Sequence, residues 1–147
     1  MPEKETLNRA REDKQEGKSP STQAGEFVHE EMDHIREGKH GARSTKQAIA
    51  IGLSKARRAG VELPPPKKGS ASAETRRKAR RDASRSKRRS SPSPTRSRAA
   101  SKALRREGHS AASRSSLARQ ARTSARSRSQ AARSRAAKQA ARTRKRK

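Results

Sequence analysis

Basic residues crowd the C-terminal half of the chain, and this charge limits what the chain can fold into. Residues 67–147 hold 29 of the 41 Lys and Arg residues, three acids and no aromatic residue, so these 81 residues carry +26 of the formal net charge of +27. Hydrophobic residue types make up 26% of the chain, against about 45–50% in ordinary globular domains. A chain with so few apolar residues and so much charge buries too little surface to offset the entropy lost on folding. We therefore predict a mostly disordered protein.

Residue types that are missing exclude further classes of protein. The chain has no Cys, which excludes disulfides and thiolate metal sites. No apolar run reaches the ~18 residues that a membrane span needs. The charged N-terminal stretch has no hydrophobic segment behind it, unlike a signal peptide. We expect a protein of the cytoplasm without a membrane span.

Composition divides the chain into four segments. We predict a disordered polar tail over residues 1–22, a helical hairpin over residues 23–63, a Pro-rich linker over residues 64–70 and a disordered Arg/Ser/Ala-rich basic tail over residues 71–147. The expected fold class is accordingly a small all-α hairpin, about residues 24–60, attached to a long disordered basic tail.

The first helix of the hairpin is predicted to end at Gly38. Phe27, Val28, Met32 and Ile35 share one side of this helix, which is the pattern of a helix with one buried face. Glycine just beyond such a stripe commonly ends a helix in the left-handed conformation.

The second helix is predicted to begin after Ser44. Ser44 and Gln47 have the spacing of a capping box, in which the two side chains bond the free N–H groups of the first turn. Gly60 supplies the stop, and the three prolines of residues 64–66 prevent continuation. With so few large apolar side chains the hairpin should be marginal alone. Self-association or docking on a protein partner would stabilise it.

Residues 29–34 have the sequence His-Glu-Glu-Met-Asp-His, which resembles the zinc-protease helix motif only superficially. That motif needs two His four residues apart on one face. His29 and His34 are five apart and diverge by about 140° around a helix. We interpret the segment as a solvated polar face. No Ser/His/Asp, P-loop or dinucleotide-binding pattern occurs elsewhere, so we expect no enzyme, no metal site and no cofactor.

The basic tail is the strong functional signal, because Lys and Arg neutralise phosphates and release condensed counterions. Phe27 is the single aromatic residue of Phe, Trp and Tyr type, which disfavours a surface for stacking single-stranded bases. We expect nucleic-acid contacts from Lys67, Lys68, Arg76, Arg77, Lys78, Arg80, Arg81, Arg85, Lys87, Arg88, Arg89, Arg105, Arg106, Arg142, Arg144, Lys145, Arg146 and Lys147. We also consider a contribution to nucleic-acid binding from the hairpin residues Lys46, Lys55, Arg57 and Arg58.

Residues 46–59, KQAIAIGLSKARRA, resemble the hallmark helix of a family of small basic bacterial and phage proteins of unknown function. Members of that family carry a KQAIAIxLSxA segment after a helix and a Lys-His-Gly-like turn. Residues 39–41 match the turn, and the resemblance covers residues 24–63, with Lys55 where Glu is commoner. The family has no established activity to transfer. The tail separately resembles bacterial histone-H1-like proteins in its Ala-rich basic composition. The resemblance of the hairpin to the bacterial and phage family implies a bacterial cytoplasm and nucleoid as the setting.

The expected function is sequence-nonspecific DNA binding of a nucleoid-associated, histone-H1-like kind, by phosphate neutralisation through the tail. An RNA- or ribosome-associated protein is one alternative. A protein-interaction adaptor acting through the hairpin is another, and the hairpin is also the expected place for a homo-oligomer contact. DNA is the more expected nucleic-acid partner.

Overall fold

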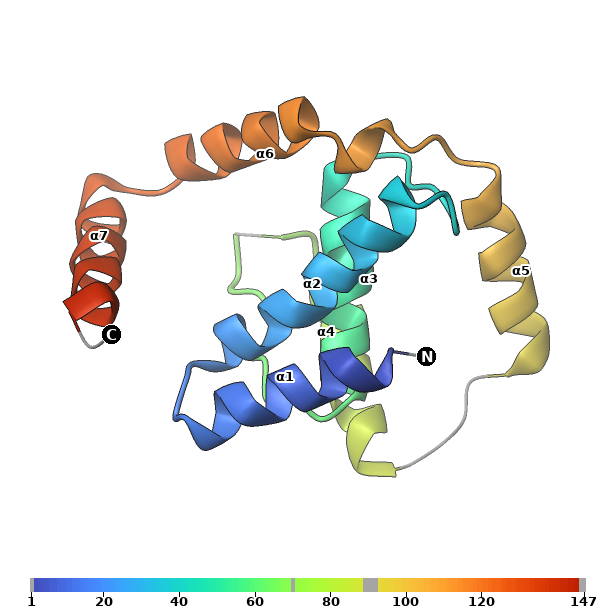
Figure 1. The fold of residues 1–147 in the computed structure, drawn as a ribbon, viewed down its shortest axis with the longest axis horizontal. Helices are drawn as coiled ribbons and strands as arrows, with labels where there is room; N and C mark the ends of the chain where they lie inside the picture. Colours follow the sequence, from blue (N-terminus) through green and yellow to red (C-terminus); the bar gives the residue numbers. More distant parts are fainter. Residues whose placement is uncertain (1, 70, 89–92, 146–147) are drawn as a thin grey trace. The chain divides into compact units, whose positions relative to one another are not determined.

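A computed structural model describes residues 2–69, 71–88 and 93–145, and these residues form an all-α protein. The helices of this described part are α1 (Lys4–Gln15), α2 (Pro20–Arg36), α3 (Thr45–Arg58), α4 (Ala73–Arg88), α5 (Pro94–Arg105), the 3-10 helix η1 (Ser110–Ala112), α6 (Arg114–Arg126) and α7 (Gln130–Lys145). The chain divides into two units, Met1–Ser113 and Arg114–Lys147. In the first unit α2 lies against both α1 and α3, and α3 also contacts α4 (Figure 1).

The prediction of a mostly disordered protein was wrong, and the expectation of an intrinsically disordered chain is corrected with it. Helices occupy most of the described chain, including most of the described residues of the segments 1–22 and 71–147, which were expected to be disordered tails. The composition argument failed because a helix satisfies its backbone hydrogen bonds within its own segment. Ala and Arg also have high intrinsic helix propensity. Such a segment can be helical without a large apolar core.

α1 packs against α2 although its buried side is mostly polar. Thr6, Ala10 and Asp13 are buried, and Leu7 packs against an apolar cluster that includes Ala10 and Phe27. These buried residues follow one another at intervals of three and four, which places them on one side of a helix. Thr and Asp do not count as apolar, so hydrophobic periodicity gave no sign of this side.

α2 begins at Pro20, several residues before the first apolar position of the predicted helix. The side chain of Ser19 accepts a hydrogen bond from the Thr22 N–H, and Pro20 occupies the first turn. Ser as N-cap followed by Pro is a common helix start. The predicted core residues are confirmed as buried at Phe27, Met32 and Ile35, and Val28 is half-buried.

α2 and α3 approach each other closely at Gly52. A Cβ atom built on Gly52 would lie 2.7 Å from the Cα of Val28 and 3.0 Å from the carbonyl oxygen of Phe27. Only glycine lets a backbone come so near to another backbone. Gly52 therefore sets the distance between the two helices.

The capping prediction for α3 is confirmed at Ser44. Its Oγ accepts a hydrogen bond of 3.2 Å from the Gln47 N–H. The Gln47 side chain reaches back to the N–H of Arg43 at 2.7 Å, one residue before the position that the standard capping box uses. One free donor of the first turn, the Gln47 N–H, and the Arg43 N–H that precedes the cap are thereby satisfied.

The predicted stop at Gly60 is also confirmed. Gly60 has a φ of 97°, and the Val61 N–H bonds to the Ala56 carbonyl at 3.0 Å. This is the Schellman arrangement, which turns the chain back over the last helical turn. Val61 and Leu63 consequently pack against the apolar cluster around Phe27.

Glu30 and Glu31 correct the interpretation of residues 29–34 as a solvated polar face. Their side chains are 2% and 0% exposed, and the Nζ of Lys55 lies 3.3 Å from Glu30 Oε1 and 2.6 Å from Glu31 Oε2. α2 lies between α1 and α3 and so is covered on two sides. The pattern of one apolar side and one polar side describes a helix that packs on a single neighbour, and α2 packs on two.

The first unit extends beyond the predicted hairpin to the segment around η1. The Ala42 N–H bonds to the Gly108 carbonyl at 3.0 Å, and the Thr45 Oγ1 donates to the Ala111 carbonyl at 2.6 Å. Ala111 is 4% exposed. Residues 104–112 thus complete the packing around the turn between α2 and α3.

Candidate nucleic-acid interface

α4 has one side against α3 and a basic side in solvent. Ala79 is 5% exposed, whereas Arg77 and Arg81, one turn apart from each other, lie on the opposite side and are exposed. Lys78 pairs with Glu74 at 2.7 Å, and this hydrogen bond holds the pKa of the Glu74 carboxyl below its usual value. The outer side of α4 is therefore a row of positive charge with one paired acid.

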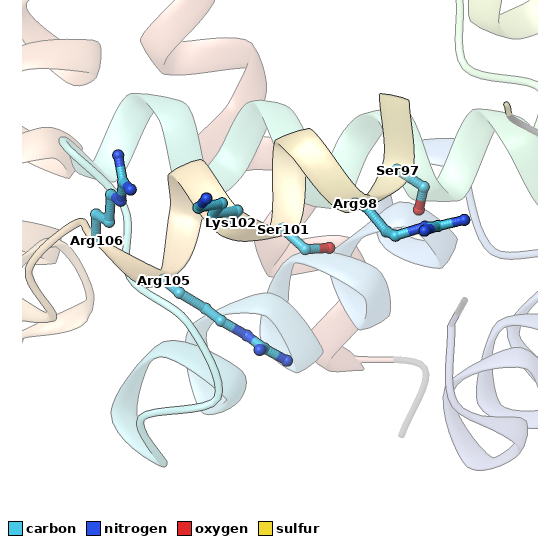
Figure 2. A pocket seen from close by; sticks show the side chains of 6 residues that line it. All are labelled: Ser97, Arg98, Ser101, Lys102, Arg105 and Arg106. Atoms are coloured by element: carbon cyan, nitrogen blue, oxygen red, sulfur yellow. The ribbon is translucent and has the colours of Figure 1, made fainter. Parts of the chain in front are cut away.

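α5 carries basic and hydroxyl side chains together along its length. Figure 2 shows a pocket lined by Ser97, Arg98, Ser101, Lys102 and Arg105 of this helix and by Arg106, which follows it. Arg98, Lys102 and Arg105 are spaced by four and three residues, so they are neighbours on the helix surface. In Figure 2 the long side chains of Arg98 and Arg105 leave the helix on the same side as Ser101. Guanidinium, ammonium and hydroxyl groups are the donors that commonly contact phosphate oxygens.

The second unit, taken by itself, contains α6 and α7 and has 13 basic residues and no acid over residues 114–147. On α6, Arg119, Arg122 and Arg126 are exposed on one side. Leu117 and Gln120 are half-buried on the other side. The exposed basic residues of α7 are Arg133, Arg135, Lys138, Arg142 and Arg144. Both helices therefore present guanidinium groups to solvent.

The tail residues predicted to contact nucleic acid are spread over several helices. The exposed ones are Lys67, Lys68, Arg77, Lys78, Arg80, Arg81, Arg105, Arg106, Arg142 and Arg144. Arg76 is half-buried. The backbones of Arg85, Lys87, Arg88 and Lys145 belong to α4 and α7. Arg89, Arg146 and Lys147 lie outside the described residues.

The four hairpin residues divide into two exposed and two enclosed side chains. Lys46 and Arg58 are exposed. Lys55 is 18% exposed and paired with buried carboxylates. Arg57 is 7% exposed, and burial lowers the pKa of its guanidinium from the usual value. Of these four residues, Lys46 and Arg58 are the ones whose side chains can reach a phosphate.

Sequence reasoning left out exposed bases on three helices. They include Arg98 and Lys102 on α5, Arg119, Arg122 and Arg126 on α6, and Arg133, Arg135 and Lys138 on α7. Their helical spacing was available in the sequence as a signal. This spacing was not used as a signal, because side chains share a face only in a segment that is helical, and these segments were expected to be disordered.

Residues 19–68 match the model of one protein family. That family is described as a family of unknown function (DUF6496). The match covers α2, α3 and the start of the connection to α4, which agrees with the resemblance over residues 24–63. It does not reach the basic helices, so it offers no support for a histone-H1-like tail. No curated protein and no solved structure matches the chain.

Within residues 2–69, 71–88 and 93–145, no helix is both long enough and apolar enough to cross a membrane.

Proposed function

We propose that the protein binds nucleic acid without sequence preference, with duplex DNA as the main partner, through the basic sides of α4 to α7. The observation that supports this is the scarcity of acids among so many exposed bases. Residues 67–147 contain 29 basic residues and three acids, so most of these bases have no carboxylate to neutralise them. Phosphates supply that charge, and each phosphate contact releases condensed counterions.

Helical order favours this mode of binding. Arg side chains on a formed helix have fixed spacing, so less freedom is lost when they meet phosphates than in an unstructured chain. The planar guanidinium donates two parallel hydrogen bonds to a phosphate. Exposed Arg at neighbouring positions of α4, α5 and α6 would contact successive phosphates along a strand.

The acids of the first unit interfere little with this binding, because many are already paired within the unit. Arg9 Nε lies 2.6 Å from Glu26 Oε2, and Lys18 Nζ lies 2.7 Å from Asp13 Oδ1. The hydrogen bond to Glu26 raises the pKa of Arg9 above its usual value. Because a base lies beside each of these carboxylates, the acids of residues 1–37 repel phosphates less than unpaired acids would.

The burial of Phe27 favours duplex DNA over single-stranded RNA as the partner. Recognition of single strands relies on aromatic side chains that stack on bases. Phe27 is 1% exposed in the core, so its ring is not available for stacking. Phosphate contact along a duplex needs no such ring. A role in the bacterial nucleoid, like that of histone-H1-like proteins, goes with this proposal.

An adaptor function of the α2–α3 hairpin is less favoured. α2 is covered by α1, and α3 is covered by α4, with η1 against both. Much of the surface that a partner would need is therefore occupied within the first unit.

A salt titration of binding tests the proposal. The full chain is titrated into labelled duplex DNA and into a hairpin RNA of equal length, and anisotropy is measured at several salt concentrations. With about ten phosphates engaged, affinity for the duplex should fall by roughly 10³ to 10⁵ between about 50 and 200 mM salt. Tighter binding to the RNA at equal salt would replace DNA by RNA as the partner. Failure to bind either at low salt would refute the proposal.

A further inference from the structure

Two histidines and a buried glutamate converge where α2 ends. Glu31 and His34 are one turn apart on α2, and His40 follows the turn after the helix. One potential ligand atom from each residue lies within 4.8 Å of the other two. The side chains of Glu31, His34 and His40 are 0%, 13% and 16% exposed. His29, the first residue of the motif considered in the sequence, is outside this cluster, with a 67% exposed side chain paired to Asp33.

The turn after α2 is what returns His40 to the helix. Gly38 has a φ of 74°, a conformation that side-chain-bearing residues rarely adopt. The Gly38 N–H bonds to the Ile35 carbonyl at 3.2 Å, and the Lys39 N–H bonds to the His34 carbonyl at 2.9 Å. These two bonds reverse the chain direction. His40 thereby faces His34 and Glu31, which precede it by six and nine positions in the sequence.

The two ring nitrogens of His40 have different neighbours. Nδ1 lies 3.1 Å from the backbone carbonyl oxygen of Gly41, which only accepts hydrogen bonds, so Nδ1 carries a proton. Nε2 lies 3.2 Å from Glu31 Oε1. In the neutral ring Nε2 then has a lone pair that faces a carboxylate oxygen. Two acceptors at this distance need a cation between them, which is either a proton, on the ring or on the carboxyl group, or a metal ion.

We propose that Glu31, His34 and His40 form a binding site for a transition-metal ion, with Zn²⁺ as the best fit. Two imidazoles and one carboxylate form a donor set that Zn²⁺ takes in sites with an open fourth position. Mg²⁺ and Ca²⁺ prefer oxygen ligands throughout. Bonds of about 2.0–2.2 Å in a tetrahedron place neighbouring donor atoms about 3.4 Å apart. Oε1 of Glu31 and Nε2 of His40 are 3.2 Å apart.

Two neighbouring side chains affect how a metal ion would bind: Lys55 contacts Glu31, and Glu3 contacts His34 and would have to move. Lys55 Nζ lies 2.6 Å from Glu31 Oε2, so it holds the carboxylate while Oε1 remains for the metal, as outer partners of metal ligands do. Neither oxygen of Glu31 makes a well-directed hydrogen bond. Glu3 Oε1 lies 2.9 Å from His34 Nε2 and 3.2 Å from Lys39 Nζ. Glu3 is 51% exposed, so its side chain has room to turn away from His34.

Titration of the full chain with ZnCl₂ tests the site. Isothermal calorimetry in a non-chelating buffer near neutral pH should give one ion per chain, and the melting temperature should rise with the Zn²⁺ concentration. His34→Gln and His40→Gln should each weaken binding by at least about 10-fold. His29→Gln is the matched control, because it removes an imidazole from the same helix outside the cluster. Its Zn²⁺ affinity should equal that of the unchanged chain.

Three results would overturn the site. The first is no heat and no change in melting temperature when Zn²⁺ is added to the unchanged chain. The second is equal affinity in the unchanged chain and in folded His40→Gln or Glu31→Gln, with folding checked by circular dichroism without metal. The third is Mg²⁺ binding as tight as Zn²⁺ binding. The first and second results would assign the space between Glu31 and His40 to a proton.

Discussion

At the scale of single residues, Gly52 gives the clearest stability prediction. Gly52→Ala places a methyl group 2.7 Å from the Cα of Val28, so the two helix backbones must move apart. We expect the free energy of unfolding to fall by about 1–3 kcal/mol, measured by urea denaturation followed by circular dichroism. Gly25→Ala on α2 is the control, since its Cβ would meet nothing within 4 Å and should raise stability by about 0.5–1 kcal/mol. Equal effects of the two changes would contradict the close approach of α2 and α3.

Lys55 gives a second prediction at this scale, about buried charge. Lys55→Met leaves Glu30 and Glu31 buried at 2% and 0% exposure without their cation. Breaking such a pair from one side should lower the free energy of unfolding by about 3–5 kcal/mol. Lys46→Met, at an exposed position of the same helix, should change it by less than about 0.5 kcal/mol. The same urea denaturation measures both variants, and similar values for the two would show that Lys55 is solvated.

At the scale of the helix, the basic side of α5 can be tested separately from net charge. The triple change of Arg98, Lys102 and Arg105 to Gln removes three exposed bases from one helix. The slope of log affinity against log salt should decrease by about 2.7 for duplex DNA. The matched control changes Lys4, Arg11 and Lys14, three exposed bases of α1, to Gln. If the control lowers the slope as much, binding depends on total charge and not on the basic helices.

Helices were predictable where their signals are local. The start of α3 at Ser44 and the stops at Gly38 and Gly60 follow from residues within a few positions of one another. α1 was missed because two of its three buried residues, Thr6 and Asp13, carry no apolar signal. The basic helices were missed for a related reason. Composition was used to judge whether a core could form, whereas helix formation in α4 to α7 depends on local propensity.

At the scale of the whole molecule, the division at Ser113 predicts that the two units can be separated. A 1–113 fragment keeps the hydrogen bonds of Ala42 to Gly108 and of Thr45 to Ala111, so its melting temperature should equal that of the full chain. A 1–93 fragment loses the acceptors, at about 1 kcal/mol for each buried bond, and should melt at a lower temperature. Circular dichroism measures both fragments. Equal melting of the two fragments would show that residues 104–112 add nothing to the first unit.

Binding measurements on the 1–113 fragment show which unit carries the nucleic-acid contacts. Residues 114–147 contain 13 of the 41 basic residues and no acid. Their removal should weaken binding to duplex DNA at low salt and reduce the salt dependence, while the melting temperature is unchanged. Unchanged affinity of the 1–113 fragment would confine the interface to α4 and α5.

The sequence by itself determined the features that depend on neighbouring residues or on simple sums. These are the charge of +26 over residues 67–147, the stop of α2 at Gly38, the start and stop of α3 at Ser44 and Gly60, and the buried stripe of Phe27, Met32 and Ile35. Tertiary structure alone decided which charged residues are enclosed. Lys55 is beside Glu31, and His40 is beside both Glu31 and His34, because packing brings together residues that no local pattern connects. Contact between distant residues depends on how whole helices meet, and for these helices that depends on Gly52 and the turn at Gly38.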